Sequence, residues 1–187
     1  MHLPRTRNGE RIVNYTTTIA SPVGSLMLVS DGSALTALLF ADEHGARLED
    51  ALRASGNIVA SDEAVPLPEA RRELAEYFAG RRRVFAIPLA LRGTPFQKRV
   101  WEALRRIPYG ATTSYREIAR AVGSPAAMRA VGAANGSNRL AIVVPCHRVI
   151  GADGTLTGYG GGLARKHALL DLEAAGGRAA RTRSATG

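Results

Sequence analysis

The sequence predicts an α/β protein of the α+β type. A small N-terminal domain with an antiparallel sheet and helices (1–92) is followed by a mostly helical C-terminal domain with a helix-turn-helix (93–175). Short β-branched and apolar runs between turn residues fill 15–40, helical periodicity dominates after residue 94, and a Gly-containing break separates two short helices beyond residue 114. The chain has 187 residues, 45% of them hydrophobic, which suits one large or two small folded domains.

The N-terminal domain is expected to begin with three strands. β-Branched and apolar residues predict strands at 15–19, 25–30 and 34–40. Asp31-Gly32 is a strong hairpin signal between the last two. Residues 43–55 have helical character, and 57–62 are ambiguous. An amphipathic helix is expected at 69–80 and a possible strand at 84–91.

Two capped helices are expected to open the C-terminal domain. Thr94-Pro95-Phe96-Gln97 matches a capping box, with Thr as the N-cap and Gln at the third helical position, and predicts a helix to about Arg106. Ser114 and Glu117 show the same pattern and predict a helix over 115–122.

A helix-turn-helix is expected next. Gly123-Ser124-Pro125 breaks the chain, and a third helix is predicted from Ala126 to about Asn135. Next come a buried apolar run at 139–144 and a turn at 151–154. A Gly-rich loop at 158–162 leads into a last helix at 163–175. Residues 176–187 contain several Gly and Arg and few apolar residues, so a disordered tail is expected.

Charge is distributed unevenly between the two halves. Residues 1–93 carry 11 Arg against 11 acidic residues, whereas 94–187 carry 12 Arg and 2 Lys against 5 acidic residues and hold the whole net charge of +9. A bias toward Arg codons would explain the 23 Arg beside 2 Lys, but not the shortage of acidic residues in the second half. The pattern predicts an anionic partner for the second half.

Cysteine and histidine content excludes several classes of protein. Cys146 is the only Cys, so neither an internal disulfide nor a Cys-rich zinc site can form, and the four His are scattered. No run of 18 apolar residues exists and residues 1–11 are polar and basic, so neither a transmembrane helix nor a signal peptide is expected. We therefore expect a cytoplasmic protein without a metal or a cofactor.

The sharpest local feature is the segment Ile142–Ile150, where Cys146, His147 and Arg148 lie within an apolar run. A thiolate is a strong nucleophile, nearby cations lower the pKa of a thiol, and a His can accept its proton. The segment therefore favours a nucleophilic Cys. The alternative is a small buried hydrophobe, which a lone Cys in an apolar stretch usually is.

Three further features admit both a structural and a functional interpretation. The helix over 126–136 is built almost entirely of small residues besides Arg129, so it either packs against a neighbour or enters a groove with Arg129 as a probe. The Gly-rich segment 158–162 either connects flexibly or brings backbone N–H groups close to a ligand. Glu173, near the end of the last helix, is either solvated or pairs with His147.

Together these residues resemble the O6-alkylguanine-DNA alkyltransferase family, the methylated-DNA–protein-cysteine methyltransferases. The motifs keep the family's order and spacing from residue 94 to residue 173, whereas the first 90 residues match only as a general pattern. The matching motifs are Gly93-Thr94-Pro95-Phe96-Gln97, Val100-Trp101, Ile107-Pro108-Tyr109-Gly110, Ser114-Tyr115, Arg129-Ala130-Val131-Gly132, Asn138, Pro145-Cys146-His147-Arg148-Val149, Gly158-Tyr159-Gly160-Gly161-Gly162 and Glu173. The resemblance implies DNA repair by irreversible transfer of an alkyl group from O6-alkylguanine to Cys146, with O4-alkylthymine as a further candidate substrate.

The resemblance also implies a role for each matching residue. Cys146 would be the nucleophile, His147 its base through a water molecule, and Glu173 the acid that orients His147. Tyr115 would donate a proton to the guanine as it leaves. The residues that would form or support the base pocket are Asn138, Val149, Tyr159, Gly160 and Lys166.

For DNA, the resemblance implies that the damaged base is flipped out of the duplex. Arg129 would enter the base stack where the base left, and small residues would let the recognition helix enter the minor groove. These small residues are Ala130, Gly132 and Ala133. Double-stranded DNA is the expected partner, and the protein is expected to be a monomer in solution, with side-by-side assembly on DNA as an option.

The sequence departs from two variants of the family. Some members hold a zinc ion in the N-terminal domain, but residues 1–93 contain no Cys and only His2 and His44, so no zinc is predicted. Alkyltransferase-like proteins lack Cys at the nucleophile position, so Cys146 favours transfer. Two other functions stay open: a non-catalytic helix-turn-helix DNA binder, and a Cys-dependent hydrolase that turns over a small substrate.

Overall fold

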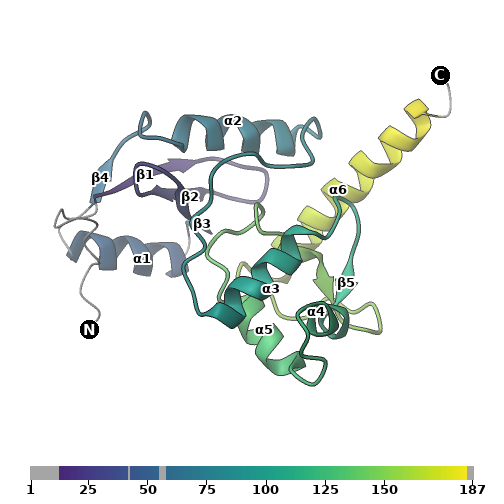
Figure 1. Ribbon diagram of the computed structural model, residues 1–187. Helices are drawn as coiled ribbons and strands as arrows, with labels where there is room; N and C mark the ends of the chain where they lie inside the picture. The colour runs from purple at the N-terminus through teal and green to yellow at the C-terminus, as the bar shows by residue number, and fades with distance from the viewer. Residues whose placement is uncertain (1–12, 42, 55–57, 185–187) are drawn as a thin grey trace.

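The computed structural model describes residues 13–41, 43–54 and 58–184, and it confirms the predicted α+β class (Figure 1). A four-stranded sheet with two helices forms the N-terminal part, and helices dominate the C-terminal part. The two parts share one continuous hydrophobic core that extends from the sheet to the last helix. Side chains of both parts can therefore meet in one site.

The sheet has the strand order β3-β2-β1-β4 and is mixed. β1 (Asn14–Ile19), β2 (Leu26–Ser30) and β3 (Leu35–Phe40) are the three predicted strands, and they pair antiparallel. The ambiguous segment forms β4 (Ile58–Ala60), which pairs parallel to β1, so the expectation of an antiparallel sheet is wrong at this edge. The reason is that α1 (Glu43–Ala54) connects β3 to β4, and a helical crossover returns the chain in the same direction.

Alternation along the strands places a helix on each face of the sheet. In β2, Leu28 belongs to the main core together with Leu74 of α2 (Leu67–Phe78). Met27 and its neighbours on the opposite face form a second cluster, against which Leu48 of α1 packs. The alternating pattern of a strand thus makes a three-layer arrangement, in which the α2 side belongs to the core that extends into the C-terminal part.

The segment 84–91 is not a strand of the sheet, contrary to the expectation. It makes one isolated bridge to β3, in which the N–H of Leu35 bonds to the carbonyl of Pro88 and the N–H of Ala90 bonds to the carbonyl of Leu35. Pro88 has no N–H to donate, and a proline does not fit a continuous ladder. The segment instead links the sheet to the C-terminal helices.

Two capping boxes start the first C-terminal helices, and both predictions are confirmed. In α3 (Pro95–Arg105), the Thr94 hydroxyl accepts from the N–H of Gln97, and the Gln97 side chain accepts from the N–H of Thr94. Residues 114–117 form the same reciprocal pair at the start of α4 (Tyr115–Ala121). Side chains thus satisfy N–H groups that lack a partner in the first turn of a helix.

α4 and α5 (Met128–Gly136) form the predicted helix-turn-helix. α5 begins two residues later than expected, because the N–H of Ala127 bonds to the carbonyl of Ser124 and closes a turn first. After α5, a buried segment leads to the 3-10 turn η1 (Cys146–Arg148). The short strands β5 (Thr113–Ser114) and β6 (Val149–Ile150) then pair parallel and hold the turn beside α4.

The last helix, α6 (Leu163–Ser184), is longer than expected. The expectation of a disordered tail over 176–187 is wrong as far as Ser184, and residues 185–187 lie outside the described part of the chain. Ala and Arg are good helix formers, and adding residues to an existing helix costs much less than starting one. The final turns extend away from the rest of the protein (Figure 1).

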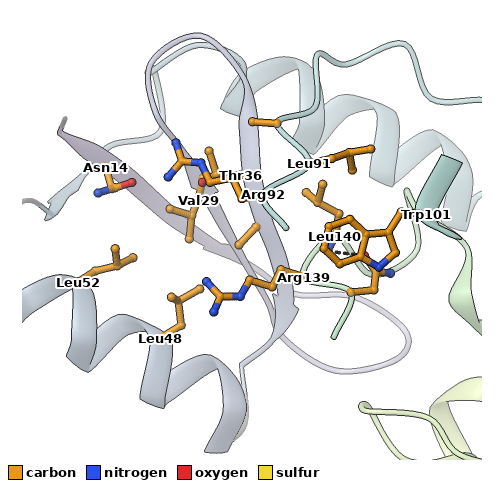
Figure 2. Close-up of a pocket in the computed structure, with 13 residues that line it drawn as sticks. Asn14, Val29, Thr36, Leu48, Leu52, Leu91, Arg92, Trp101, Arg139 and Leu140 are labelled. Carbon is orange, nitrogen blue, oxygen red and sulfur yellow. Dashed lines mark hydrogen bonds between the residues drawn. The ribbon is translucent and has the colours of Figure 1, made fainter. Parts of the chain in front are cut away.

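A cavity of about 60 Å³ lies where the two parts of the molecule meet. Figure 2 shows Leu48 and Leu52 of α1 on one side of it, and Trp101 and Leu140 of the C-terminal part on the other. An isolated bridge between Leu38 of β3 and Leu140 ties the sheet to the segment before η1. Over residues 13–41, 43–54 and 58–184, no helix has the length and apolar character that a membrane span requires.

Candidate active site

Cys146 is the first residue of η1 and is 5% exposed. Asn138, just beyond the end of α5, holds this turn in place. Its Nδ2 donates to the carbonyl of Val144 at 2.9 Å and to Cys146 Sγ at 3.1 Å, while its Oδ1 accepts from the N–H of Leu140 at 2.9 Å. The side chain thus links the end of the recognition helix to the thiol.

The backbone before Cys146 makes a sharp bend. Ile142 has a φ of 70°, in the left-handed region that β-branched residues rarely adopt. The N–H of Val144 bonds to the carbonyl of Leu140 at 2.8 Å and closes the bend. Ile142 is buried, so packing holds a conformation that costs roughly 1–3 kcal/mol. This bend directs the chain into η1.

His147 and Glu173 form a buried pair, as the sequence allowed. His147 Nε2 lies 2.9 Å from Glu173 Oε1, and both side chains are fully buried. Because Glu173 accepts hydrogen bonds, the ring proton belongs on Nε2, which leaves Nδ1 with a lone pair. Nδ1 is buried and has no hydrogen-bond partner among the described residues. It is the ring atom that can accept a proton.

Burial sets the protonation states of the thiol and the imidazole. Burial raises the pKa of the Cys146 thiol, and the hydrogen bond from Asn138 and the charge of Lys166 offset this only in part. Burial lowers the pKa of His147, although the hydrogen bond and charge of Glu173 act in the opposite direction. At neutral pH the site therefore holds a thiol and a neutral imidazole, and it needs proton transfer to form a thiolate.

Glu173 is the centre of a hydrogen-bond network larger than the sequence suggested. Its other donors are Arg148, through Nε at 2.9 Å and Nη2 at 2.8 Å, the N–H of Gly110 at 3.0 Å and the hydroxyl of Tyr77 at 2.8 Å. Burial by itself would raise the pKa of Glu173, but the hydrogen bonds and charges of His147 and Arg148 lower it to about 2. Glu173 is therefore ionised at any ordinary pH.

A hollow of about 70 Å³ opens beside Cys146. Its lining comes from β3, from α5 and the segment after it, and from the Gly-rich loop: Leu39, Phe40, Asn135, Gly136, Asn138, Ala141, Cys146, Tyr159, Gly160 and Gly161. Sequence reasoning placed four of these in the site, namely Asn138, Cys146, Tyr159 and Gly160, and it included Gly161 in the Gly-rich segment that could approach a ligand; it missed the other five. For Asn135 a signal existed, since it is a polar residue on a helix of small residues. For Phe40 there was none, because it lies on a strand of the N-terminal part.

Phe40 and the Gly-rich loop fit closely against each other. The rings of Phe40 and Tyr159 meet edge to face with centroids 6.1 Å apart. A Cβ on Gly161 would lie 2.4 Å from the Phe40 ring, so only glycine allows this approach. The Tyr159 hydroxyl and Asn135 Oδ1 are buried without a hydrogen-bond partner among the described residues. Both residues line the hollow, where a polar base would offer partners.

Lys166 ties β6 to the start of the Gly-rich loop that lines the hollow. Its buried Nζ donates to the carbonyl of Val149 at 2.6 Å and to that of Thr157 at 2.8 Å. Burial lowers the pKa of Lys166. The Val149 carbonyl thus has a partner already, and Val149 does not line the hollow, whereas Gly160 does.

Tyr115 lies beside the Gly-rich loop, and it is not among the residues that line the hollow. Its hydroxyl is 3.4 Å from the carbonyls of both Thr157 and Gly158, which is long for a hydrogen bond. Burial raises the pKa of Tyr115. The hydroxyl therefore keeps its proton and is only weakly held.

α5 presents two different faces. Val131 and Ala134 are buried, and the carbonyl of Ala134 accepts a hydrogen bond from Trp101 Nε1 at 2.8 Å. The opposite face carries the residues proposed to meet DNA, of which Gly132 is half-buried and the others are exposed: Arg129, Ala130, Gly132 and Ala133. The helix thus both packs on α3 and presents a smooth outer face with one cation.

Residues 13–41, 43–54 and 58–184 contain no group of three or more His, Cys, Asp or Glu that could hold a metal ion. His2 and the side chain of His44 lie outside the described part. The absence of zinc stays a prediction for the whole chain.

Comparison with known proteins gives matches over both parts of the chain. Residues 14–91 match the model of the 6-O-methylguanine DNA methyltransferase ribonuclease-like domain, and residues 95–175 match that of the 6-O-methylguanine DNA methyltransferase DNA-binding domain.

Individual relatives match over most of their length. The constitutive methylated-DNA–protein-cysteine methyltransferase of Bacillus subtilis is 46% identical over 162 residues, which cover 86% of this chain and 96% of the relative. The methylated-DNA–protein-cysteine methyltransferase of Mycobacterium bovis is 53% identical over 156 residues, covering 83% and 90%. A crystal structure of Mycobacterium tuberculosis OGT in complex with DNA superposes with a TM-score of 0.77 at 49% identity, covering 87% of this chain and 94% of that one.

Proposed function

The chain belongs to the methylated-DNA–protein-cysteine methyltransferase family, and from this premise we propose that Cys146 is its alkyl acceptor. The protein repairs DNA by moving the alkyl group of O6-alkylguanine to a cysteine of its own, and each molecule acts once. The observation that carries the assignment to Cys146 is that it lines the hollow and directly precedes His147 of the buried His147–Glu173 pair. No other Cys exists in the chain.

The transfer begins with proton removal from Cys146. Its raised pKa keeps the thiol protonated, so a base is required. The His147 imidazole is neutral, and its Nδ1 has no hydrogen-bond partner among the described residues. We assign Nδ1 as the base that accepts the proton of Cys146 Sγ, relayed by one water molecule. Glu173 keeps Nε2 protonated and stabilises the imidazolium that forms.

The displacement then exchanges one bond for another. The Sγ lone pair attacks the alkyl carbon, the S–C bond forms, and the bond from that carbon to guanine O6 breaks. The electron pair of the broken bond passes into the guanine ring, which takes a proton from the Tyr115 hydroxyl. Tyr115 must turn from the carbonyls that it contacts weakly to make this donation. A thioether and an unmodified guanine result, and the proton that His147 received from the thiol returns through solvent to the Tyr115 phenolate.

We assign recognition of the flipped base to the hollow. Backbone groups of Cys146 and Gly160, which line the hollow, read the guanine edge, Tyr159 packs against the ring, and Lys166 holds the Val149 carbonyl and the loop. The unpartnered atoms of Tyr159 and Asn135 support a polar occupant. O4-alkylthymine is a further substrate to be tested.

Duplex DNA is bound by the C-terminal part, and we propose minor-groove entry by α5. Ala130 and Ala133 leave a thin exposed surface, which suits a groove about 6 Å wide. Exposed Arg129 fills the space of the flipped base and offsets part of the few kcal/mol that flipping costs. We further propose that the protein is cytoplasmic and monomeric, with side-by-side binding on DNA to be tested by titration on long duplexes.

The assignment is tested with duplex DNA that carries a labelled methyl group on guanine O6. We expect one label per protein, located on Cys146 by peptide mass, and none in Cys146→Ser, which should still bind DNA within about twofold because a thiol and a hydroxyl differ little in size. Label on another residue would contradict the proposal. Intact binding without label would favour the non-catalytic DNA binder, and many products per protein would favour the hydrolase.

A further inference from the structure

Tyr77 is the one residue of α2 whose hydroxyl reaches the His147–Glu173 pair in the described structure. It lies in the N-terminal part, 96 positions before Glu173, and donates to Glu173 Oε1 at 2.8 Å. Its side chain is fully buried. The proposed chemistry uses residues of the C-terminal part alone, so it gives no role to this contact from α2.

Glu173 Oε1 is shared by three donors. Tyr77 OH and Arg148 Nη2 each lie 2.8 Å from it, and His147 Nε2 lies 2.9 Å from it. A carboxylate oxygen offers about two lone-pair positions, so three donors compete for it. A change in one donor therefore alters how strongly Oε1 interacts with the other two.

The ring of Tyr77 is fixed independently of its hydroxyl. It packs against Phe78, Phe85 and Tyr109, with centroids 5.3, 5.4 and 6.0 Å away. These contacts involve carbon atoms, so a Phe at position 77 would keep them. Within the described part of the chain, the hydroxyl thus has one hydrogen-bond partner, which is the carboxylate that orients the base.

We propose that Tyr77 is a positioning residue for alkyl transfer: its hydroxyl holds Glu173 Oε1 and weakens the hydrogen bond and charge interaction between that oxygen and His147. The inference rests on the proposed function of Cys146 and His147. It gives the N-terminal part a role in the chemistry: α2 adjusts the base that removes the thiol proton. Tyr77 touches neither the substrate nor the reacting atoms and acts through Glu173.

The direction of the effect follows from charge. Without the Tyr77 hydroxyl, more negative charge on Oε1 is available to His147 Nε2, so the protonated imidazole is stabilised and the base is blocked at a higher pH. The titratable and charged groups around the imidazole and its partner Glu173 are Lys166 of α6, Arg148 and Cys146 of η1, Tyr77 of α2, and Tyr109 of the loop after α3. Of these, Tyr77→Phe removes only one neutral donor.

The test compares Tyr77→Phe with Tyr109→Phe. Tyr109 lies near the same carboxylate, but the one hydrogen bond of its hydroxyl among the described residues is to the carbonyl of Leu172, at 3.5 Å. Single-turnover transfer from free O6-benzylguanine to Cys146 is measured across pH, which avoids effects on DNA binding. We expect the acid limb of the Tyr77→Phe profile to move up by as much as one unit, so that the rate on that limb falls up to about tenfold while the alkaline plateau changes less than about twofold. Tyr109→Phe should follow the wild type.

An acid limb at the wild-type position in Tyr77→Phe would overturn the inference, whatever the plateau rate. If Tyr77→Phe does not fold, 3,5-difluorotyrosine introduced at position 77 keeps the ring and donates more strongly, so the acid limb should move down; no movement would overturn the inference equally. Alkylation of wild-type Cys146 is checked by mass in the same samples. Its absence would defeat the proposed function, whereas alkylation with an unmoved limb defeats the role of Tyr77 alone.

Discussion

The two halves of this protein differ in net charge and in how well the sequence reveals which of their residues contribute to the active site. Residues 94–187 hold the whole net charge of +9 and every residue that the sequence assigned to the site, whereas residues 1–93 are neutral. Yet the neutral half supplies Phe40 to the wall of the hollow and Tyr77 to the acid that orients the base. Charge and motifs mark the half that meets DNA, while the site itself is completed by both halves.

The largest effect is expected from Glu173→Gln, which tests whether the C-terminal network is the centre of the site. Removing the charge leaves Arg148 buried without its ion partner, so the free energy of unfolding should fall by about 3–5 kcal/mol. Transfer to Cys146 should slow by on the order of a hundredfold, because His147 loses the acid that orients it. Urea unfolding and single-turnover rates measure the two effects.

Asp171→Asn on the same helix is the matched control. Asp171 pairs with His167 on the surface, where both side chains are more than half exposed. The loss of such a pair should cost less than about 1 kcal/mol. Equal unfolding midpoints for the two variants would show that the buried network does not stabilise the protein.

Arg129→Ala tests the DNA-facing side of the comparison. We expect repair of O6-methylguanine in duplex DNA to slow by about tenfold or more, since the flipped base loses the side chain that replaces it in the stack. Transfer from free O6-benzylguanine should be unaffected. Arg105→Ala, which removes another exposed Arg at the end of α3, serves as the control for charge. Equal slowing on duplex and free base would contradict the role of Arg129.

Acid should destabilise the protein in two stages, both from the C-terminal network. The folded pKa of His147 lies below its ordinary value, so stability is lost as pH falls from about 6.5 through that lowered value. The pKa of Glu173 is about 2 against an ordinary 4.5, so its contribution is full above 4.5 and lost as pH falls toward 2. Urea unfolding midpoints should fall as pH drops below about 6.5 and fall further below about 4.5; a flat profile between neutral pH and pH 3 would show that neither group is coupled to folding.

The smallest effect is expected from Phe40→Leu, which tests whether the neutral half sets the range of alkyl groups. A smaller apolar side chain widens the hollow beside Tyr159, so the rate for benzyl relative to methyl should rise by about threefold to tenfold. Leu52→Ala, in α1 and away from the hollow, should leave the ratio unchanged. An unchanged ratio in Phe40→Leu would confine substrate selection to the C-terminal part.

Local patterns were predictable to the extent that neighbours along the chain cause them. The capping boxes at Thr94 and Ser114 were correct because each is a contact across three residues. The possible strand at 84–91 does not form, and the disordered tail expected at 176–187 is wrong as far as Ser184. Pro88 limits the former to one bridge, and α6 extends through the latter to Ser184.

The sequence by itself determined the family, the candidate nucleophile Cys146 and the helix-turn-helix with its capped first helix. These depend on residue types at fixed spacing along the chain. Only the tertiary structure decided what completes the site. Tyr77 meets Glu173 across 96 positions, and Phe40 of the N-terminal sheet meets Gly161 of the Gly-rich loop. Such contacts arise where two apolar surfaces pack into one core, and no local pattern in either segment encodes the partner.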